Sequence, residues 1–306
     1  MVLQRCARAL CATLLQLTPA HPHPLLQRAL IGRMLIKHTV ALATGQSWHA
    51  MQLKRSAAGK PELVTPPAAA PRFNFNISHH GDWVAIVAHD AAAVGCDVSK
   101  VQRPRGTRSV ADFFRTMREC FTAREWAAIR QGDGGAVRGE AHAAASEAAW
   151  ETAALRRFYR NWTLKESFTK AIGIGLGFDL QRIEFRALPL APVGGVDGGA
   201  DGASPRFEVW VDGRHRAEWA FVCATLDDAH PITVALGPWL ASVDEHCARF
   251  AAPPAADEPA SSIRIQDGSP EGERELLDFG ARFAILSDRD LLASMSLRDR
   301  VVAGFC

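Results

Sequence analysis

The chain of 306 residues contains no apolar run that approaches the roughly 20 residues a membrane-spanning helix needs. Its seven cysteines are odd in number and form no CxxC pair. This scatter provides neither a disulfide framework nor a zinc site, and it favours a reducing compartment. We therefore predict a protein of the cytosol that does not associate with a membrane. The cysteines are Cys6, Cys11, Cys96, Cys120, Cys223, Cys247 and Cys306.

Acidic residues are missing from the beginning of the chain: no Asp or Glu precedes Glu62, whereas eight basic side chains do. A basic first segment suits an anionic ligand or an acidic protein partner. It also suits an organelle transit peptide, because such peptides avoid acidic residues and favour arginine. A mitochondrial or plastid location therefore stays open beside the cytosolic one, with residues 1–17 as the candidate peptide. The eight residues are Arg5, Arg8, Arg28, Arg33, Lys37, Lys54, Arg55 and Lys60.

The first part of the chain combines one helix with short strands. A helical pattern of apolar residues begins at Pro24 and stops at Gly45. Three strand-like runs come after it, at 73–78, 83–88 and 94–99. We predict a helix packed beside a small antiparallel sheet.

The second part begins with helices. They are predicted at 109–119 and 123–131, where Thr122 and Glu125 have the spacing of a capping box. Residues 131–155 are rich in Gly and Ala and are predicted to be an insertion with weak helical character.

A stronger helical pattern covers about 157–172 and precedes several strands. Asp212-Gly213 is a typical turn pair, and it is predicted to join the second and third strands as a hairpin. The strands are predicted at 180–186, 206–211, 217–224 and 232–236.

The order of a helix followed by antiparallel strands thus occurs twice. The predicted fold class is α+β, with two similar halves related by a pseudo-twofold and a ligand cleft between them. The predicted division is an atypical basic N-terminus at 1–23, a first half at 24–105, a second half at 106–240, and a linker with a C-terminal tail at 241–306.

Three acidic or basic side chains stand out in the two halves. Glu166 and Lys170 lie together on a face of their helix that differs from the apolar stripe. They suit either an exposed pair at i, i+4 or a site. Asp97 interrupts a short apolar strand, where an unpaired carboxylate is costly to bury. It suits an exposed strand end or a ligand of a hard cation such as Mg²⁺.

Two loops carry further polar residues. Ser78-His79-His80-Gly81 forms a predicted hairpin tip, and Gly59-Lys60-Pro61 forms a turn that can offer an N–H group and an ammonium to a phosphate. Both also suit ordinary polar loops. No other His or Cys has a spacing that supports zinc binding by the His pair.

The order of these segments is more specific than any one of them. The series GKP, FNFNISHHGDW, VGCDVSK and WTLKESFTKAIGIGLGF resembles the 4′-phosphopantetheinyl transferases of the two-half, monomeric type. It is most similar to the eukaryotic aminoadipate-semialdehyde dehydrogenase phosphopantetheinyl transferases. The resemblance covers residues 26–240, and less specifically the tail, whereas the insertion has no counterpart.

The resemblance implies an activity and its partners. It implies a monomeric, Mg²⁺-dependent enzyme that transfers 4′-phosphopantetheine from coenzyme A to a serine of acyl or peptidyl carrier proteins, which present an acidic surface. It implies no nucleic-acid partner. A coenzyme A-binding protein of the same fold without transfer activity is one alternative, and a Mg²⁺-dependent nucleotide hydrolase that needs no carrier is a second.

The resemblance also assigns roles to residues. Asp97 and Glu166 match the family's metal carboxylates, with Glu166 also the candidate general base, and Lys170 matches its lysine beside the pyrophosphate. These three are the predicted catalytic residues, and they also contact coenzyme A. The other predicted coenzyme A contacts are Arg55, Gly59, Lys60, Asn76, Ile77, Ser78 and His79.

Three departures from the family pattern affect these expectations. Pro24 occupies the position near which the family carries an arginine that binds coenzyme A. We expect either that the sequence is an incomplete or mis-started version or that Arg28 or His23 substitutes. The strand region before the first helix is expected to be shortened or replaced. Ser99 stands where many relatives place a third carboxylate, although the eukaryotic branch lacks it too.

Overall fold

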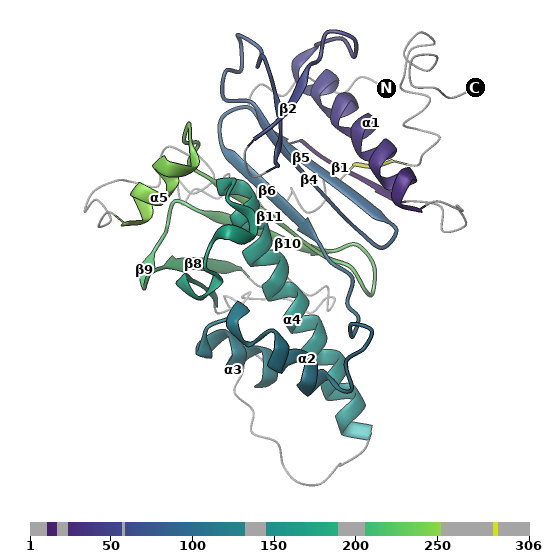
Figure 1. Cartoon of the computed structure of the whole chain (residues 1–306), viewed down its shortest axis with the longest axis vertical. Helices are drawn as coiled ribbons and strands as arrows, with labels where there is room; N and C mark the ends of the chain where they lie inside the picture. The colour runs from purple at the N-terminus through teal and green to yellow at the C-terminus, as the bar shows by residue number, and fades with distance from the viewer. Residues whose placement is uncertain are drawn as a thin grey trace, which may run out of the picture.

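The computed structural model describes residues 11–16, 24–56, 59–131, 145–188, 206–251 and 284–286. The fold is a mixed α+β structure of small, mainly antiparallel sheets with helices packed against them (Figure 1). This confirms the predicted fold class, whereas the pseudo-twofold relation of the halves stays a prediction. Among the described residues, no helix has both the length and the apolar character required to cross a membrane.

The first region is a helix on a four-stranded sheet. Helix α1 (Pro24–Thr44) packs on a sheet with the strand order β12-β1-β5-β4. The helix ends where predicted, at Gly45, whose φ of +71° suits glycine. The strands are β1 (Cys11–Gln16), β4 (Asn74–His80), β5 (Trp83–His89) and β12 (Ala284–Leu286).

Strand β1 is absent from the strands predicted by the sequence pattern. It pairs antiparallel with β5 and parallel with β12, and its Leu14 and Leu15 are buried. A strand is therefore present before α1, and the expectation that this region is shortened or replaced stays a prediction. Cleavage of a transit peptide after residue 17 would remove this strand from the sheet.

A short hairpin comes after α1. Its strands β2 (Leu53–Arg55) and β3 (Pro61–Leu63) are antiparallel. Residues 57–58 at its tip lie outside the described residues. Arg55 is exposed on this hairpin, whereas Lys60 is partly buried.

Strand β6 (Ala93–Val98) lies in a different sheet from the one predicted. It pairs with β11 (Pro231–Gly237), which in turn pairs with β10 (Ala220–Thr225). Its link to β4 is made by side chains, because the polar residues of β4 accept from the N–H groups of β6 and the residues just after it. The donor–acceptor pairs are Val94–Asn74 (3.0 Å), Cys96–Asn76 (2.8 Å), Val98–Ser78 (3.2 Å) and Lys100–His80 (3.1 Å).

Helix α4 (Ala145–Ile172) crosses β6 and β11 (Figure 1). It begins earlier than the predicted residue 157, so part of the supposed insertion is regular helix, while residues 132–144 lie outside the described part. The helix approaches β6 closely at Gly95. A Cβ there would collide with the Ser167 carbonyl oxygen and would lie 2.5 Å from the Ala171 nitrogen, so only glycine permits this contact.

An aromatic cluster supports the first half of α4. Helices α2 (Val110–Thr116) and α3 (Ala123–Gln131) pack here, and the rings of Phe113 and Phe158 are 4.7 Å apart. The capping box is confirmed, since Thr122 N donates to Glu125 Oε2 (2.8 Å) and Glu125 N donates to Thr122 Oγ1 (3.3 Å).

The remaining strands form a small separate sheet. Strands β7 (Ile183–Ala187), β8 (Phe207–Val211) and β9 (Arg214–His215) are antiparallel. Asp212-Gly213 makes the predicted turn with φ values of 52° and 73°, but it joins β8 to the two-residue β9. The predicted pairing of 206–211 with 217–224 is wrong, because β10 turns away to pair with β11.

The other helices are short. Helix α5 (Val243–Ala251) contributes Phe250 to the core beneath α4 and the neighbouring sheets. Three 3₁₀ turns complete the described elements: Arg118–Cys120, Gly175–Gly177 and Leu180–Arg182.

Candidate active site

Four polar side chains meet where α4 crosses β6. Asp97 is only 6% exposed. Its Oδ1 accepts from Lys170 Nζ at 2.5 Å and from Ser78 Oγ at 2.9 Å, and its Oδ2 accepts from Ser99 Oγ at 3.0 Å. Lys170 Nζ also donates to Ser78 Oγ at 3.1 Å. The alternative that Asp97 lies at an exposed strand end is therefore wrong.

Glu166 lies one helical turn before Lys170 and is 9% exposed. Its Oε1 is buried and has no hydrogen-bond partner among the described residues. Burial raises the pKa of Glu166, the nearby Asp97 charge raises it further, and Lys170 acts against both. The alternative of an exposed Glu166–Lys170 pair is also wrong, because Lys170 pairs with Asp97.

Lys170 remains a cation in this setting. Burial lowers its pKa, but the charges of Asp97, Cys96 and Glu166, together with the hydrogen bond to Asp97, outweigh burial, so the pKa of Lys170 is raised overall. The cluster thus contains two carboxylates and one ammonium. Lys170 pairs with Asp97, while Glu166 keeps an oxygen without a hydrogen-bond partner among the described residues. We name Ser78, Asp97, Ser99, Glu166 and Lys170 the carboxylate cluster.

The carboxylate cluster fits a hard cation. The described residues contain no group of three or more His, Cys, Asp or Glu side chains arranged for a metal. Magnesium, however, is commonly held by one or two carboxylates together with substrate phosphates and water. The buried, unpartnered Oε1 of Glu166 beside Asp97 is the feature that fits such an ion.

The predicted coenzyme A contacts on the β4–β5 hairpin differ in exposure: Asn76 and Ser78 are buried, and His79 is exposed. The Asn76 carboxamide accepts from Cys96 N, and Ile77 packs on the core beneath α1. His79 is exposed. Burial, then the charges of Arg28 and Lys170, lower the pKa of His79. His79 is therefore the residue of this segment that is accessible to a ligand, while Ser78 belongs to the carboxylate cluster.

Arg55 makes a hydrogen bond within the β2–β3 turn, whereas Lys60 links the turn to β6 and α4. Arg55 Nη1 donates to the Gly59 carbonyl at 2.7 Å, and Gly59 has a φ of +83°. Lys60 Nζ donates to the carbonyls of Val94 (3.3 Å) and Ala171 (3.4 Å). Burial lowers the pKa of Lys60 to about 8. The structure thus brings Lys60 next to the end of α4 but shows no contact of Arg55 or Gly59 with the carboxylate cluster.

Arg28 lies on α1, one turn after Pro24. Its Nε is buried and has no hydrogen-bond partner among the described residues. Its charge lowers the pKa of both His79 and His80, which places it close to the β4–β5 hairpin. Arg28 is therefore close to the predicted coenzyme A contact His79, and its role as a substitute for the missing arginine stays a prediction; His23 lies outside the described residues.

Comparison with known proteins connects this arrangement to a family. Residues 26–91 match the family described as 4′-phosphopantetheinyl transferase, N-terminal, and residues 93–234 match the 4′-phosphopantetheinyl transferase superfamily. A phosphopantetheinyl transferase of Thraustochytrium is 38% identical over 240 residues, which are 78% of this chain and 72% of that protein. The chain belongs to the 4′-phosphopantetheinyl transferase superfamily.

Other members of the superfamily are similar over less of their length. The human L-aminoadipate-semialdehyde dehydrogenase-phosphopantetheinyl transferase is 39% identical over 209 residues, 68% of this chain and 60% of the human protein. A 4′-phosphopantetheinyl transferase of Bacillus subtilis is 30% identical over 159 residues, 52% of this chain and 58% of that protein. The match to the superfamily, at residues 93–234, includes the segments that carry Asp97, Glu166 and Lys170.

Two residues that hold the site of this superfamily member do not stand out in the sequence. Gly95 permits the close approach of α4 to β6. Lys165, directly before Glu166, is fully buried, and its Nζ contacts Glu125 Oε2 at 2.8 Å and donates to the Leu180 carbonyl at 2.8 Å. A lysine amid the apolar face of a helix is the signal that could have revealed this anchor.

Proposed function

We propose that this protein transfers 4′-phosphopantetheine from coenzyme A to a serine of an acyl or peptidyl carrier protein. The observation that carries the proposal is the convergence of Asp97 with Glu166 and Lys170, which leaves one buried carboxylate oxygen unsatisfied. The names of the relatives support the same reaction. The products are the phosphopantetheinylated carrier and 3′,5′-ADP.

The reaction is a displacement at phosphorus. The serine oxygen bonds to the β-phosphorus of coenzyme A, the bond from that phosphorus to the bridging oxygen breaks, and 3′,5′-ADP leaves with that oxygen. The serine proton passes to Glu166, whose raised pKa suits a proton acceptor. Catalysis of this kind depends on alignment and on compensation of phosphate charge.

Different residues of the carboxylate cluster perform these tasks. The Lys170 ammonium donates to phosphate oxygens, while Ser78 and Asp97 fix its position through their hydrogen bonds. Asp97 and Glu166 would hold Mg²⁺, and Ser99, which donates to Asp97, stays in the outer shell. When bound, this ion neutralises negative charge on the pyrophosphate.

Coenzyme A is proposed to bind along the first region of the fold. Arg28 and His79 offer a guanidinium and an imidazole near the carboxylate cluster, since the charges of Arg28 and Lys170, after burial, lower the pKa of His79. Lys60 lies beside the end of α4, where its ammonium is shared between two carbonyls. Arg55 and Gly59 would contact the nucleotide from the β2–β3 turn, and Asn76 and Ile77 through their backbone.

The proposed function also includes the division of the chain into two halves, its oligomeric state and its location. We propose that the halves 24–105 and 106–240 are related by a pseudo-twofold, and that the protein acts as a monomer in the cytosol. The meeting of β6 from the first half with α4 and β11 from the second supports a site shared by both halves. The domain limits at 23 and 241 belong to the same proposal.

The test is a transfer assay with an apo carrier protein, coenzyme A and Mg²⁺, read by intact mass. The expected result is a carrier heavier by one phosphopantetheine group, with 3′,5′-ADP released in equal amount. Because Pro24 replaces an arginine, binding of coenzyme A without transfer is the competing function. Calorimetric binding of coenzyme A with no mass gain on any of several acyl and peptidyl carriers would establish that alternative.

A further inference from the structure

Side chains, rather than a neighbouring strand, satisfy one edge of β6. This strand is the outer one in the sheet β10-β11-β6, and an outer strand leaves alternate N–H groups without a backbone partner. Four side chains of β4 accept from these groups and from the residue after next, always at an offset of 20 residues. We name Asn74, Asn76, Ser78 and His80 the polar ladder.

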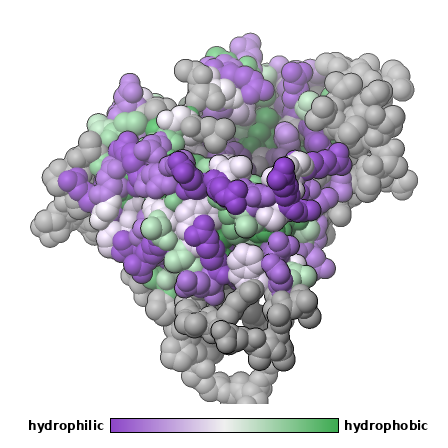
Figure 2. Space-filling view, turned by 60° about the horizontal axis from the view of Figure 1, so that its bottom comes forward, coloured by the Kyte–Doolittle hydropathy of each residue, from purple (hydrophilic) through white to green (hydrophobic). Residues whose placement is uncertain are grey.

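The two middle members of the polar ladder are buried. Asn76 and Ser78 are 5% and 6% exposed, whereas the two outer members are partly buried. Water can satisfy polar groups on the outer surface, as on the mainly hydrophilic face turned forward in Figure 2. It has little access to Cys96 and Val98, which are buried, so the N–H groups of these two residues depend on the side chains of β4.

The two buried hydrogen bonds lie on either side of Asp97. Asn76 Oδ1 accepts from Cys96 N at 2.8 Å, and Ser78 Oγ accepts from Val98 N at 3.2 Å. The backbone of β6 is thus held one residue before and one residue after Asp97. Ser78 also donates to Asp97 Oδ1 at 2.9 Å, so it contacts the carboxylate directly, whereas Asn76 acts on Asp97 through the backbone.

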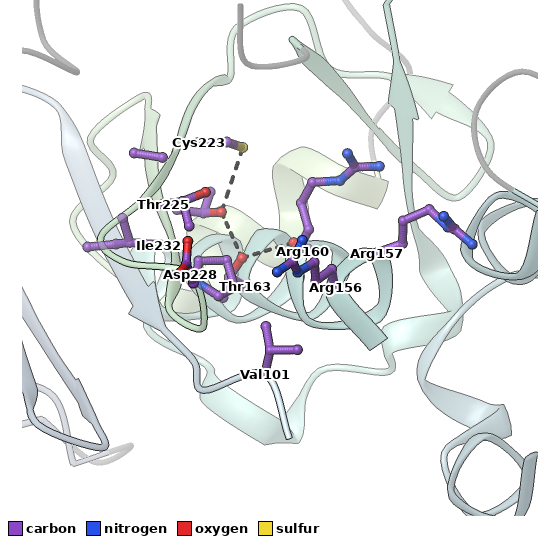
Figure 3. Close-up of a pocket in the computed structure, with 12 residues that line it drawn as sticks. Val101, Arg156, Arg157, Arg160, Thr163, Cys223, Thr225, Asp228 and Ile232 are labelled. Carbon is purple, nitrogen blue, oxygen red and sulfur yellow. Dashed lines mark hydrogen bonds between the residues drawn. The ribbon is translucent and has the colours of Figure 1, made fainter. Parts of the chain in front are cut away.

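The opposite edge of β6 is fixed by backbone pairing. Asp97 pairs in register with Thr233 of β11. Thr233 Oγ1 is 2.8 Å from Thr163 Oγ1 on α4, and this contact lies in the wall of a cavity of about 300 Å³ between α4 and the β10–β11 hairpin (Figure 3). Because Thr163 and Glu166 belong to the same helix, this edge of β6 is joined to the element that carries the second carboxylate. The polar ladder supports the remaining edge.

A divalent ion would make the direction of the Asp97 carboxylate important. Magnesium requires near-ideal octahedral geometry, so a small displacement of a ligand weakens its binding. Partners that orient a metal ligand typically contribute 10- to 100-fold to metal affinity or activity. The buried Asn76 carboxamide fits the role of such a partner, since little of it is accessible to coenzyme A.

We propose that Asn76 is a positioning residue of the cation site. Its carboxamide fixes β6 at Cys96 and thereby sets the direction of the Asp97 carboxylate. The proposal rests on the proposed function, in which Asp97 and Glu166 would hold Mg²⁺. It gives the Asn76 side chain a role that differs from a direct contact with coenzyme A.

Three variants separate this role from a general contribution to folding. Asn76→Ala removes the acceptor and leaves Cys96 N without it. Asn76→Ser provides a new acceptor, because the hydroxyl of Ser78 reaches β6 at the same offset in the next pair. Asn74→Ala is the matched control, since it removes the same kind of hydrogen bond, of 3.0 Å, from Val94, which is farther from Asp97 along β6. Circular dichroism checks that each variant is folded.

Magnesium is titrated by two measurements. The first is the thermal midpoint with coenzyme A present and no carrier protein, and the second is the rate of transfer. We expect Asn76→Ala to need about tenfold more Mg²⁺ for half of the full effect in both, the low end of losses for partners of metal ligands. Asn76→Ser and Asn74→Ala should stay within about threefold of wild type. At saturating Mg²⁺, the KM for coenzyme A should be unchanged in Asn76→Ala.

Two results would overturn the inference for a folded Asn76→Ala variant. One is a Mg²⁺ requirement equal to that of Asn74→Ala. The other is a higher KM for coenzyme A at an unchanged Mg²⁺ requirement, which would show a direct contact with coenzyme A. If Asn76→Ala does not fold, Asn76→Leu, which keeps the volume of the side chain without an acceptor, takes its place. A tenfold higher Mg²⁺ requirement in Asn76→Ser would also contradict the proposal.

The two measurements also separate this inference from the proposed function. If wild type transfers nothing but its thermal midpoint rises with Mg²⁺, the proposed function fails, and the midpoints of the variants still decide the role of Asn76. If the midpoint of wild type does not respond to Mg²⁺, the inference is overturned, whatever the transfer assay shows.

Discussion

Two lysines of α4 show the difference between an ion pair that stabilises the fold and one that prepares a site. Lys165 contacts Glu125 Oε2 at 2.8 Å, and the second oxygen of Glu125 accepts from Phe185 N at 2.9 Å. Lys170 pairs with Asp97, but the nearby Glu166 keeps a buried oxygen without a partner among the described residues.

The comparison teaches that burial alone does not mark a functional charge. Asp97 is buried, as the Lys165–Glu125 pair is, and Lys170 is partly buried. The Lys165–Glu125 pair makes all its contacts within the protein, whereas the carboxylate cluster has two carboxylates for one lysine. An unsatisfied buried oxygen costs free energy, and a bound cation can recover that cost. Substitutions in the Lys165–Glu125 pair should therefore change the stability of the fold, and substitutions in the carboxylate cluster should change the rate of transfer.

The largest effect is expected from the Lys165–Glu125 pair. Lys165→Met leaves Glu125 buried without its cation and should lower the free energy of unfolding by about 3–5 kcal/mol. Urea denaturation measures this loss. The double variant with Glu125→Leu removes both charges and should recover part of it. A loss below about 1 kcal/mol in the single variant would contradict the structural role.

In the carboxylate cluster, Asp97→Ala should reduce the rate of transfer about a thousandfold, which corresponds to an activation barrier higher by about 4 kcal/mol. The reason is the loss of both the predicted cation ligand and the acceptor that fixes Lys170. Intact-mass kinetics on an apo carrier provide the measurement, with circular dichroism as the control for folding. Activity within tenfold of wild type would remove Asp97 from the site.

An intermediate effect is expected from Arg28, which belongs to neither pair. Arg28→Ala should raise the KM for coenzyme A roughly tenfold or more while kcat changes little, because a charge-assisted contact with a phosphate is lost. Arg33→Ala on the same helix serves as the control. An unchanged KM for Arg28→Ala would show that another residue replaces the missing arginine.

The smallest effect is expected from Ser99. Its hydroxyl donates to Asp97 Oδ2 at 3.0 Å and so acts through that carboxylate. Ser99→Ala should therefore keep transfer within about tenfold, the low end of losses for such indirect contacts. A hundredfold loss that higher Mg²⁺ restores would instead identify Ser99 as a direct ligand.

Local patterns predicted the parts of the fold that depend on near neighbours. The helix from Pro24 and the capping box at Thr122 result from periodicity and spacing over a few residues. The pairing of β6 with β11 does not, because a strand pattern gives no information about a partner more than 130 residues away. Strand β1 was not predicted for the same reason.

The candidate site was predictable only in part. Asp97, Glu166 and Lys170 stood out through their family pattern, and the structure brings them together. The residues that support the site could not be found from local sequence. Gly95 matters because α4 packs directly on it, and Lys165 because the fold brings Glu125 within 2.8 Å of it.

The last prediction concerns Glu166, whose raised pKa determines how the stability of the protein changes with pH. The pKa is raised in the folded state above the ordinary value of 4.5, so the folded protein holds this proton more tightly than the unfolded chain. Its charged form therefore reduces stability above the raised pKa, and this penalty fades as the pH falls towards the unfolded value. Without Mg²⁺, Glu166→Gln should be more stable than wild type at neutral pH, and the difference should shrink in acid.

The most direct measurement is the thermal midpoint of wild type and Glu166→Gln, with coenzyme A present, as Mg²⁺ is added. The account predicts that the midpoint of wild type rises with Mg²⁺, because the ion binds the folded carboxylate cluster, whereas that of Glu166→Gln starts higher and barely changes. Equal increases in both proteins would contradict the assignment of the open Glu166 oxygen to a cation.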